Sequence, residues 1–283
     1  MLHDRQKKRI RLTILAVLAA LQGSALSAEG EPARSRLALM GTIPIYWGEA
    51  ETFDDHINGE AHQHWARAEL ERGFDLQPLD FLSAENLDGQ QFLLMAQPRG
   101  LAAQENVALD NWVRVGGRLL LFADPVMTGH SQFPFGDRRR PQDIALLSPI
   151  LSHWGLELHF DEGQQPGPRV VEHFAVPLPV NQAGRLVAVD GRFECTVSAA
   201  GIIAHCALGT GEVLILADAA LLDMDGPYPG AAGALHMLTS HIFGEFGENA
   251  GSAAADNEHA AQTLGNRPNS AWQANGQHVD RSP

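Results

Sequence analysis

Residues 91–125 read QFLLMAQPRGLAAQENVALDNWVRVGGRLLLFADP, and this stretch decides the class of fold. Two apolar runs, 91–98 and 118–125, are bounded by turn residues, as buried strands are. The residues between them have helical spacing and stop at a pair of glycines. A strand, a helix and a strand in this order predict a βαβ unit with parallel strands and a right-handed crossover. One face of the predicted helix carries Leu101, Glu105, Leu109, Trp112 and Val113.

The rest of the chain extends this unit into a single α/β domain. Residues 37–42 read as a further apolar strand, and residues 165–212 hold short β-rich runs separated by glycines and prolines. We therefore expect residues 37–247 to form an α/β domain with a mostly parallel sheet and a β-rich insertion in its C-terminal half. Residues 248–283 contain few large apolar side chains, so we expect a disordered tail.

The N-terminus has the order of a secretory signal peptide. A basic segment is followed by an apolar run at 12–21 and then by small residues. The apolar run is far shorter than the roughly 20 residues that span a bilayer. We expect a signal peptide at 1–28, cleaved after Ser27 or Ala28, a linker at 29–36 and a periplasmic or other extracytoplasmic location. The alternative is an uncleaved N-terminus that holds the protein at the membrane.

Composition excludes several classes of function. The 283-residue chain has a formal net charge of −14, which repels phosphate backbones and makes nucleic acid an unsuitable partner. The sequence has no P-loop and no G-x-G-x-x-G motif, which disfavours an ATPase or a dinucleotide-dependent enzyme. We expect no cofactor.

The two cysteines, Cys195 and Cys206, are a candidate disulfide. An even number of cysteines in an exported protein favours a bridge, and a turn near Ala200 and Gly201 would place the two residues opposite each other on a hairpin. Opposed strand residues lie roughly 4.5–5.5 Å apart at Cα, which is within reach of a disulfide. The alternative is two small thiols that pack as hydrophobic groups.

The ends of the predicted strands form the candidate ligand site. In open parallel sheets, ligands bind beyond the carboxyl ends of the strands. A cleft there would combine aromatic, acidic and histidine side chains. The alternative is that Asp124 and Asp218 cap turns by accepting backbone N–H groups. The candidate ligand-binding residues are Thr42, Trp47, Glu49, Gln97, Asp124, His130 and Asp218.

The same strand ends lack the pattern of a hydrolase nucleophile. A nucleophile elbow needs Ser or Cys in a tight turn flanked by glycines, whereas the sequence around Asp124 is FADPV. Pro125 also pushes Asp124 toward extended geometry. We therefore assign no catalytic residue and expect the protein not to be an enzyme.

A weak metal-ligand pattern lies further upstream, in DDHINGEAHQHW. It contains His56, His62 and His64, but two residues at i and i+2 share a face only on a strand. The following residues have helical spacing, so we expect a loop-to-helix junction rather than a metal site.

The stretch 91–125 resembles the auxiliary, GldG-like domain of uncharacterised ABC-type transport systems. In that family a strand ending in proline precedes the pattern Ls..e..ALd.yV..GGr and a strand ending in Asp-Pro. The segment GEVLILADAALLD resembles a later strand of the family, so the likeness covers roughly residues 37–245. The matching positions are Pro98, Leu101, Glu105, Ala108, Leu109, Asp110, Val113, Gly116, Gly117, Asp124 and Pro125.

The resemblance implies a fold, a location and a set of partners. It implies a flavodoxin-like, class I glutamine amidotransferase-like three-layer sandwich on the extracytoplasmic side, associated with ABC transporter permease and ATPase subunits. The amidotransferase strand tip would hold a catalytic Cys, and this sequence has Ala123 and Asp124 there. The chain also departs from the family in lacking a C-terminal transmembrane helix, so any membrane association would come through partners or an uncleaved N-terminus.

Three functions are compatible with these features. The first is a non-enzymatic accessory or sensing component of an envelope transporter. The second is a periplasmic solute- or glycan-binding domain that uses the strand-tip cleft. The third is a hydrolase with an unusual site around Asp124 and His130.

Overall fold

The computed structural model describes residues 34–49, 63–173, 176–189, 195–222, 226–227 and 229–244. The chain divides into two units, 1–33 and 34–283, and the first lies wholly outside the described residues. The predicted signal peptide, the predicted tail at 248–283, His56 and His62 also lie outside them. No described helix combines the length and the hydrophobicity needed to cross a membrane.

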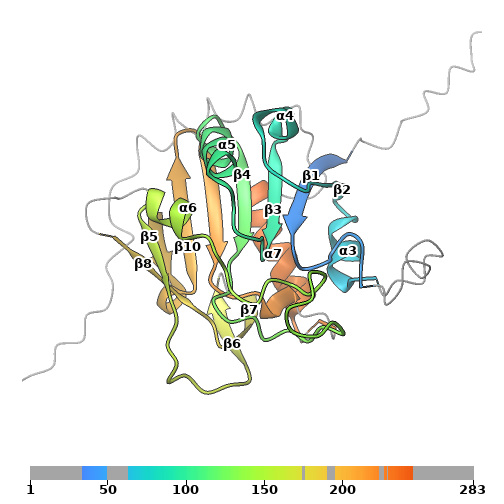
Figure 1. The fold of residues 1–283 in the computed structure, drawn as a ribbon, viewed down its shortest axis with the longest axis vertical. Coiled ribbons are helices and arrows are strands. Elements are labelled where there is room, and N and C mark those ends of the chain that lie inside the picture. Colours follow the sequence, from blue (N-terminus) through green and yellow to red (C-terminus); the bar gives the residue numbers. More distant parts are fainter. Residues whose placement is uncertain are drawn as a thin grey trace, which may run out of the picture. The chain divides into compact units, whose positions relative to one another are not determined.

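A seven-stranded sheet forms the centre of the described part, in the order β2-β1-β3-β4-β11-β10-β9 (Figure 1). The first five strands of this order run parallel, and β10 and β9 continue the sheet antiparallel. The α/β class and the mostly parallel sheet are therefore confirmed. The strands are β1 (Ser35–Gly41), β2 (Phe74–Pro78), β3 (Phe92–Ala96), β4 (Arg118–Phe122), β9 (Cys195–Ser198), β10 (Ile203–Leu208) and β11 (Gly211–Leu216).

Helices cover both faces of this sheet, because its central strands are apolar on both sides. One core lies between the sheet and α3 and α7, and the other lies between the sheet and α4, α5 and α6. Figure 1 shows α5 and α7 on opposite sides of the sheet. The helices are α3 (Trp65–Leu70), α4 (Ala84–Leu87), α5 (Ala103–Arg114), α6 (Ser148–His153) and α7 (Ala231–Phe243).

The predicted βαβ unit is confirmed as β3, α5 and β4, with β3 and β4 paired in parallel. Close packing at the end of α5 requires glycine at two positions. A Cβ on Gly117 would lie 2.4 Å from Cδ2 of Trp112, so the helix packs directly on the turn. A Cβ on Gly211, at the start of β11, would lie 1.9 Å from the carbonyl oxygen of Val113. The end of α5 therefore fits only against backbone that has no side chain.

The β-rich part supplies two small antiparallel sheets beside the main one. One pairs β5 (Leu156–His159) with β8 (Arg185–Ala188), and the other is a hairpin of β6 (Pro168–His173) and β7 (Val176–Asn181). Short 3-10 turns, η1 (Ala199–Gly201) and η2 (Ala220–Leu222), follow β9 and β11. β7 packs against α7 and η2, and its Leu178 and Val180 enter the core on the α7 side.

Cys195 and Cys206 form a disulfide between β9 and β10. The two residues stand directly opposite each other in the antiparallel register, across a turn in which Ala199 and Ala200 both have positive φ. Their Cα atoms are 3.9 Å apart, closer than the roughly 4.5–5.5 Å expected for opposed strand residues. The bridge therefore fastens β9, a four-residue edge strand, to the sheet.

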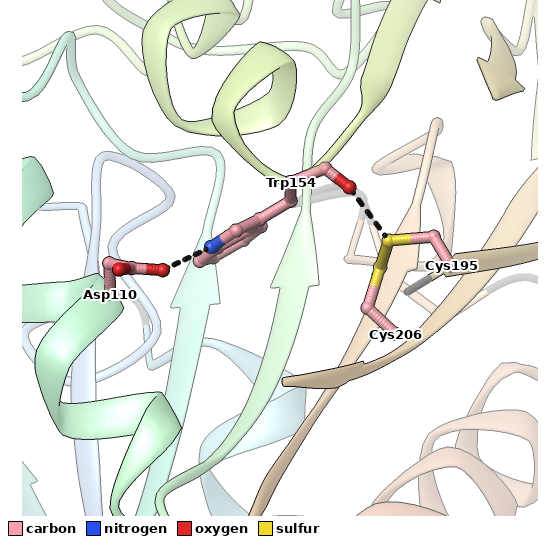
Figure 2. Close-up of a disulfide and its surroundings, with 4 residues drawn as sticks. All are labelled: Asp110, Trp154, Cys195 and Cys206. Atoms are coloured by element: carbon pink, nitrogen blue, oxygen red, sulfur yellow. Dashed lines mark hydrogen bonds between the residues drawn. A yellow bond between two sulfur atoms is a disulfide. The ribbon is translucent and has the colours of Figure 1, made fainter. Parts of the chain in front are cut away.

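Trp154 connects this disulfide to the helix of the βαβ unit (Figure 2). Its buried indole Nε1 donates a hydrogen bond to Oδ1 of Asp110 on α5, at 2.9 Å. Its carbonyl oxygen lies 3.3 Å from Sγ of Cys195. A disulfide sulfur carries no hydrogen, so this second approach is a packing contact and not a hydrogen bond.

Candidate functional site

The carboxyl ends of β1, β3, β4 and β11 lie at one edge of the sheet, as the sequence predicted. The polar residues that follow β3, β4 and β11 are all buried there. Gln97 is 0% exposed, Asp124 is 1% exposed and Asp218 is 2% exposed. The strand tips therefore bring these side chains together below the surface of the described part.

Gln97 is the strained residue of this edge. It follows β3 with a φ of 47°, which is unusual for a residue with a side chain and persists only where the surroundings hold it. Its Oε1 accepts from the backbone N of Asp124 at 2.8 Å, and its Nε2 donates to the carbonyl oxygens of Asp124 and Gln142, both at 2.9 Å. The side chain thus ties β3 to β4 and to the loop that follows β4.

Thr42 extends this connection to β1. Its hydroxyl donates to the carbonyl oxygen of Gln97 at 2.5 Å and accepts from the backbone N of Gln142 at 2.8 Å. The residue after β1 and the residue after β3 are therefore joined directly. Thr42 and Gln97 act here as links between backbone segments.

Asp124 and Asp218 accept backbone N–H groups with all four of their carboxylate oxygens. Asp124 accepts from Val126 at 2.9 Å and from Ala219 at 3.0 Å. The second of these bonds joins the tip of β4 to the tip of β11. The pair therefore has the turn-capping arrangement that the sequence left as the alternative to ligand binding.

Asp218 makes the corresponding contacts from the tip of β11. Its Oδ1 accepts from the N of Ala220 at 2.7 Å, and its Oδ2 accepts from the N of Asn181 at 2.9 Å. The bond to Asn181 anchors the end of β7, so the β6–β7 hairpin is fixed at its base to the main sheet.

Burial changes the acidity of both carboxyl groups. Loss of hydration raises the pKa of Asp124 to about 6, although its two backbone hydrogen bonds oppose the change. Burial also raises the pKa of Asp218 well above its ordinary value, and the neighbouring charge of Asp124 raises it further. A pKa near 6 suits proton exchange close to neutral pH, but the carboxyl of Asp124 meets solvent only if the segments that cover it move.

The other predicted site residues lie in the loops after β1 and β4. Glu49 is buried and accepts from Ser131 Oγ at 2.8 Å and from the backbone N of Gln132 at 3.3 Å, which joins the two loops. His130 is exposed beside this junction. Trp47 is 57% exposed, with its ring 4.7 Å from that of Tyr46. The edge thus has a buried hydrogen-bonded part and an exposed aromatic residue.

His64, the weak metal candidate within the described residues, caps a helix. Its Nδ1 accepts from the backbone N of Ala66 at 3.1 Å, so its Nε2 is the donor toward the carbonyl oxygen of Leu222, also at 3.1 Å. Both ring nitrogens are therefore engaged in holding α3. Among the described residues, no group of three or more His, Cys, Asp or Glu side chains is placed to hold a metal ion.

An ion pair beside the strand tips was not identified from the sequence as a site. Glu105 accepts a bidentate contact from the guanidinium of Arg99, at 2.8 and 2.9 Å, and also accepts from the backbone N of Leu82 and of Ala102. The signal was present, because a glutamate occupied the apolar face of the predicted helix. A charge at such a position needs a partner.

A groove of about 390 Å³ lies elsewhere, between α3 and α7. Its floor is apolar, and Glu69 and Arg72 pair with each other on its rim at 2.7 Å. It includes none of the residues predicted from the sequence. The lining residues are Glu69, Leu70, Arg72, Ala232, Gly233, Leu235, His236 and Thr239.

Comparisons with solved structures give only distant likenesses. A cold-adapted β-galactosidase from Rahnella sp. R3 aligns with 74% of this chain and 31% of its own, at 11% identity and a TM-score of 0.43. The chain thus spans about a third of the length of that enzyme. A ThuA-like protein from Bacteroides uniformis aligns with 78% of this chain and 98% of its own, at 12% identity and a TM-score of 0.42. Likeness at this level supports no functional argument.

Sequence comparison gives a clearer result. No curated protein matches the chain. A family model matches residues 43–167, which run from the loop after β1 past β5 and include the whole βαβ unit. That family is described as an ABC-type uncharacterized transport system, and the match confirms the resemblance to its auxiliary domain.

Proposed function

We propose that the protein is a non-enzymatic, extracytoplasmic accessory or sensing component of an ABC-type transport system. The observation that carries the proposal is the family match over residues 43–167. Those residues contain the motif positions whose contacts build the fold, including Glu105, Asp110 and Gly117. The partners would be the permease and ATPase subunits of the transporter.

The strand tips support a role without catalysis. The residues there are Gln97, Asp124 and Asp218, and each uses its side chain to hold neighbouring backbone. A hydrolase of the amidotransferase type would need a reactive Cys or Ser at such a tip. The Asp124–His130 hydrolase would need an accessible carboxylate, whereas Asp124 is buried and His130 is exposed.

The strand order supports the finer fold assignment. Numbered along the chain, the five parallel strands have the order 2-1-3-4-5, with β11 as the fifth. This is the order of the flavodoxin-like doubly wound sheets, and helices pack on both of its faces. We propose a flavodoxin-like sandwich on this basis, and the amidotransferase-like relationship on the sequence resemblance.

Two features support an extracytoplasmic location. The N-terminal 28 residues have the order of a signal peptide, and the disulfide suits an oxidising compartment.

The sequence holds only two lysines, Lys7 and Lys8, and both lie inside the predicted signal peptide. Cleavage would leave the new N-terminus as the only primary amine, so amine labelling of the purified protein would add one label by mass instead of three.

A photo-crosslinking pulldown from native envelopes tests the function. The absence of lysines after residue 8 makes amine-reactive reagents unsuitable, so a photoreactive amino acid should replace exposed positions such as Val107 and Val115 on or next to α5. We expect permease or ATPase subunits among the crosslinked products. Recovery of the protein alone, at monomer mass from every labelled position, would contradict the proposal.

A solute- or glycan-binding domain is the second candidate. The observation that favours it is the pair of buried aspartates with raised pKa values at the carboxyl edge of a parallel sheet, where ligands commonly bind. It predicts saturable binding of a small solute that depends on Trp47 and Asp124. Binding of that kind, without transporter subunits in the pulldown, would favour it over the accessory role.

A further inference from the structure

Three histidines from three different elements gather on the α7 side of the sheet. His205 lies on β10, His241 lies in the last turn of α7, and their ring centroids are 5.8 Å apart at an interplanar angle of 66°. His173 is the last residue of β6, opposite Val176 of β7, and is close enough for the charge of His241 to act on it. The free end of the β6–β7 hairpin therefore meets α7 at a cluster of imidazoles.

We propose that the β6–β7 hairpin is an acid-released flap, closed on α7 at neutral pH and loosened when His173 and His241 bind protons. The base of the hairpin is held at every pH, whereas the contact at its other end depends on pH. Its base is held by the hydrogen bond from Asn181 to Asp218 and by the hydrogen bond from Gly167 to the Asn181 side chain at 3.0 Å. Its other end carries His173 near His241 and packs Val171 and Val176 against the core on the α7 side, so added charge there opposes an apolar contact and not the hydrogen bonds of the base.

The electrostatics of the cluster favour release in acid. Burial lowers the pKa of His173, and the charge of His241 lowers it further. Burial likewise lowers the pKa of His241, and the charge of His205 adds to that effect. The open hairpin, with ordinary histidines, therefore binds more protons than the closed one. Closure is strongest above a pH of about 6.5 and weakens as the pH falls below that value.

One other charged group acts on the cluster, and a second lies at the end of α7. Glu212 on β11 raises the pKa of His241 and so opposes release. Arg118 on β4 reaches the carbonyl oxygen of Ile242 at 3.5 Å and adds a fixed positive charge beside the end of α7. His241 is exposed, so water screens part of the repulsion, and we expect a several-fold change in opening instead of a complete release.

Opening would uncover apolar surface. Leu178 and Val180 of β7 are buried in the core on the α7 side, in the same cluster as Leu222 and Leu238. Lifting the hairpin would expose these side chains together with the facing part of α7. The flap would thus make an apolar patch available in acid that is covered at neutral pH, which is independent of the transporter role proposed above.

Hydrogen–deuterium exchange of the full chain, read by mass spectrometry at pH 7.5 and pH 5.5, tests the flap. After correction for intrinsic exchange rates, we expect the protection of residues 168–181 to fall several-fold at pH 5.5, while β3, α5 and β4 keep theirs. His241→Gln should remove most of that fall. His236→Gln, at an exposed histidine on the same helix, should leave it unchanged.

The His241→Gln variant distinguishes the flap from other causes of lost protection. Asp218 also titrates at the base of the hairpin, but its raised pKa means that protonation favours the closed form, so it opposes release in acid. A fall in protection that persists in His241→Gln would come from a group outside the histidine cluster. General unfolding in acid would reduce protection in β3, α5 and β4 as well. Either result would overturn the proposal, as would equal protection of residues 168–181 in the wild type at both pH values.

Discussion

Glu105 and Asp124 are both buried carboxylates at the same edge of the sheet, and each accepts two backbone N–H groups. They differ in their charged neighbours. Glu105 faces the guanidinium of Arg99, which lowers its pKa to about 2. Asp124 faces Asp218, and burial without a cation raises its pKa to about 6. Backbone hydrogen bonds alone therefore do not keep a buried carboxylate acidic: the hydrogen bond from the Arg99 guanidinium dominates at Glu105, whereas loss of hydration dominates at Asp124.

The two carboxylates have different roles in their regions. Glu105 is ionised at every physiological pH, and its contacts fix the start of α5 to the loops around Leu82 and Ala102. Asp124 and Asp218 carry a charge that the fold disfavours, although their contacts also join segments. Strongly raised pKa values are more common at functional sites than elsewhere. The strand tips therefore remain a candidate ligand site, in addition to linking backbone segments.

Removing the charge of Glu105 should have the largest effect. We expect Glu105→Gln to lower the free energy of unfolding by about 2–3 kcal/mol at pH 7, because Arg99 loses its partner and an amide N–H replaces one of the accepting oxygens. Urea unfolding measures the change. The contribution of Glu105 should be complete above a pH of about 4.5 and be lost as the pH falls toward about 2.

Glu85→Gln is the matched control for this substitution. Glu85 is an exposed glutamate in the first turn of α4, and its replacement should change stability by less than about 0.5 kcal/mol. Equal effects of the two substitutions would show that the Arg99–Glu105 pair does not stabilise the fold.

The sequence predicted the framework of the fold better than the role of its polar residues. The runs at 91–98 and 118–125 are continuously apolar between their ends, so they had to be strands buried on both faces of a sheet. β3, α5 and β4 therefore followed from hydrophobicity and spacing. The opposed cysteines followed from the turn between them. These features depend on local pattern, which a single sequence records directly.

The strand tips were predictable as a location and not as a set of contacts. The partners of Gln97 are at Asp124 and Gln142, and that of Glu49 is Ser131, 82 positions away along the chain. Such pairs depend on how loops close, which no periodicity records. The positive φ of Gln97 also had no signal, because its neighbour Pro98 suggests ordinary extended backbone.

Asp124 should give a pH dependence of stability opposite to that of Glu105. The folded pKa of Asp124, about 6, lies above its ordinary value of 3.8, so the folded state binds more protons between these values. We expect Asp124 to contribute about 1 kcal/mol of added stability as the pH falls from 7 to 5. Asp124→Asn should remove this contribution, which urea unfolding at several pH values would show.

Asp88→Asn serves as the control, since Asp88 is an exposed aspartate at the end of α4. It should keep the wild-type slope of stability against pH. A wild-type slope that Asp124→Asn leaves unchanged would mean that the carboxyl of Asp124 is not desolvated, and the contrast with Glu105 would fail.

Asp110 offers a test between these extremes. Burial opposes its ionisation, but hydrogen bonds from Arg114 and Trp154 hold its pKa below the ordinary value. We expect Asp110→Asn to cost about 1 kcal/mol, because Arg114 and Trp154 keep their donors but lose one accepting oxygen and the negative charge of Asp110. A double-mutant cycle with Trp154→Phe should show a coupling of about 0.5–1 kcal/mol, and additivity would place the effect at Arg114 or at His153, whose Nε2 lies 3.2 Å from Oδ2 of Asp110.

Trp47 should show the smallest effect on stability and the clearest effect on choice of function. It is 57% exposed and contacts Tyr46 at the rim of the strand-tip edge, so Trp47→Ala should change the free energy of unfolding by less than about 0.5 kcal/mol. Because the variant keeps its fold, any loss of binding belongs to the side chain itself. Under the accessory proposal, the yield of crosslinked transporter subunits from positions on α5 should match that of the wild type. A variant that folds normally but loses a saturable small ligand would instead identify Trp47 as part of a binding site. The buried aspartates at the same edge would then line that site as well as link backbone segments.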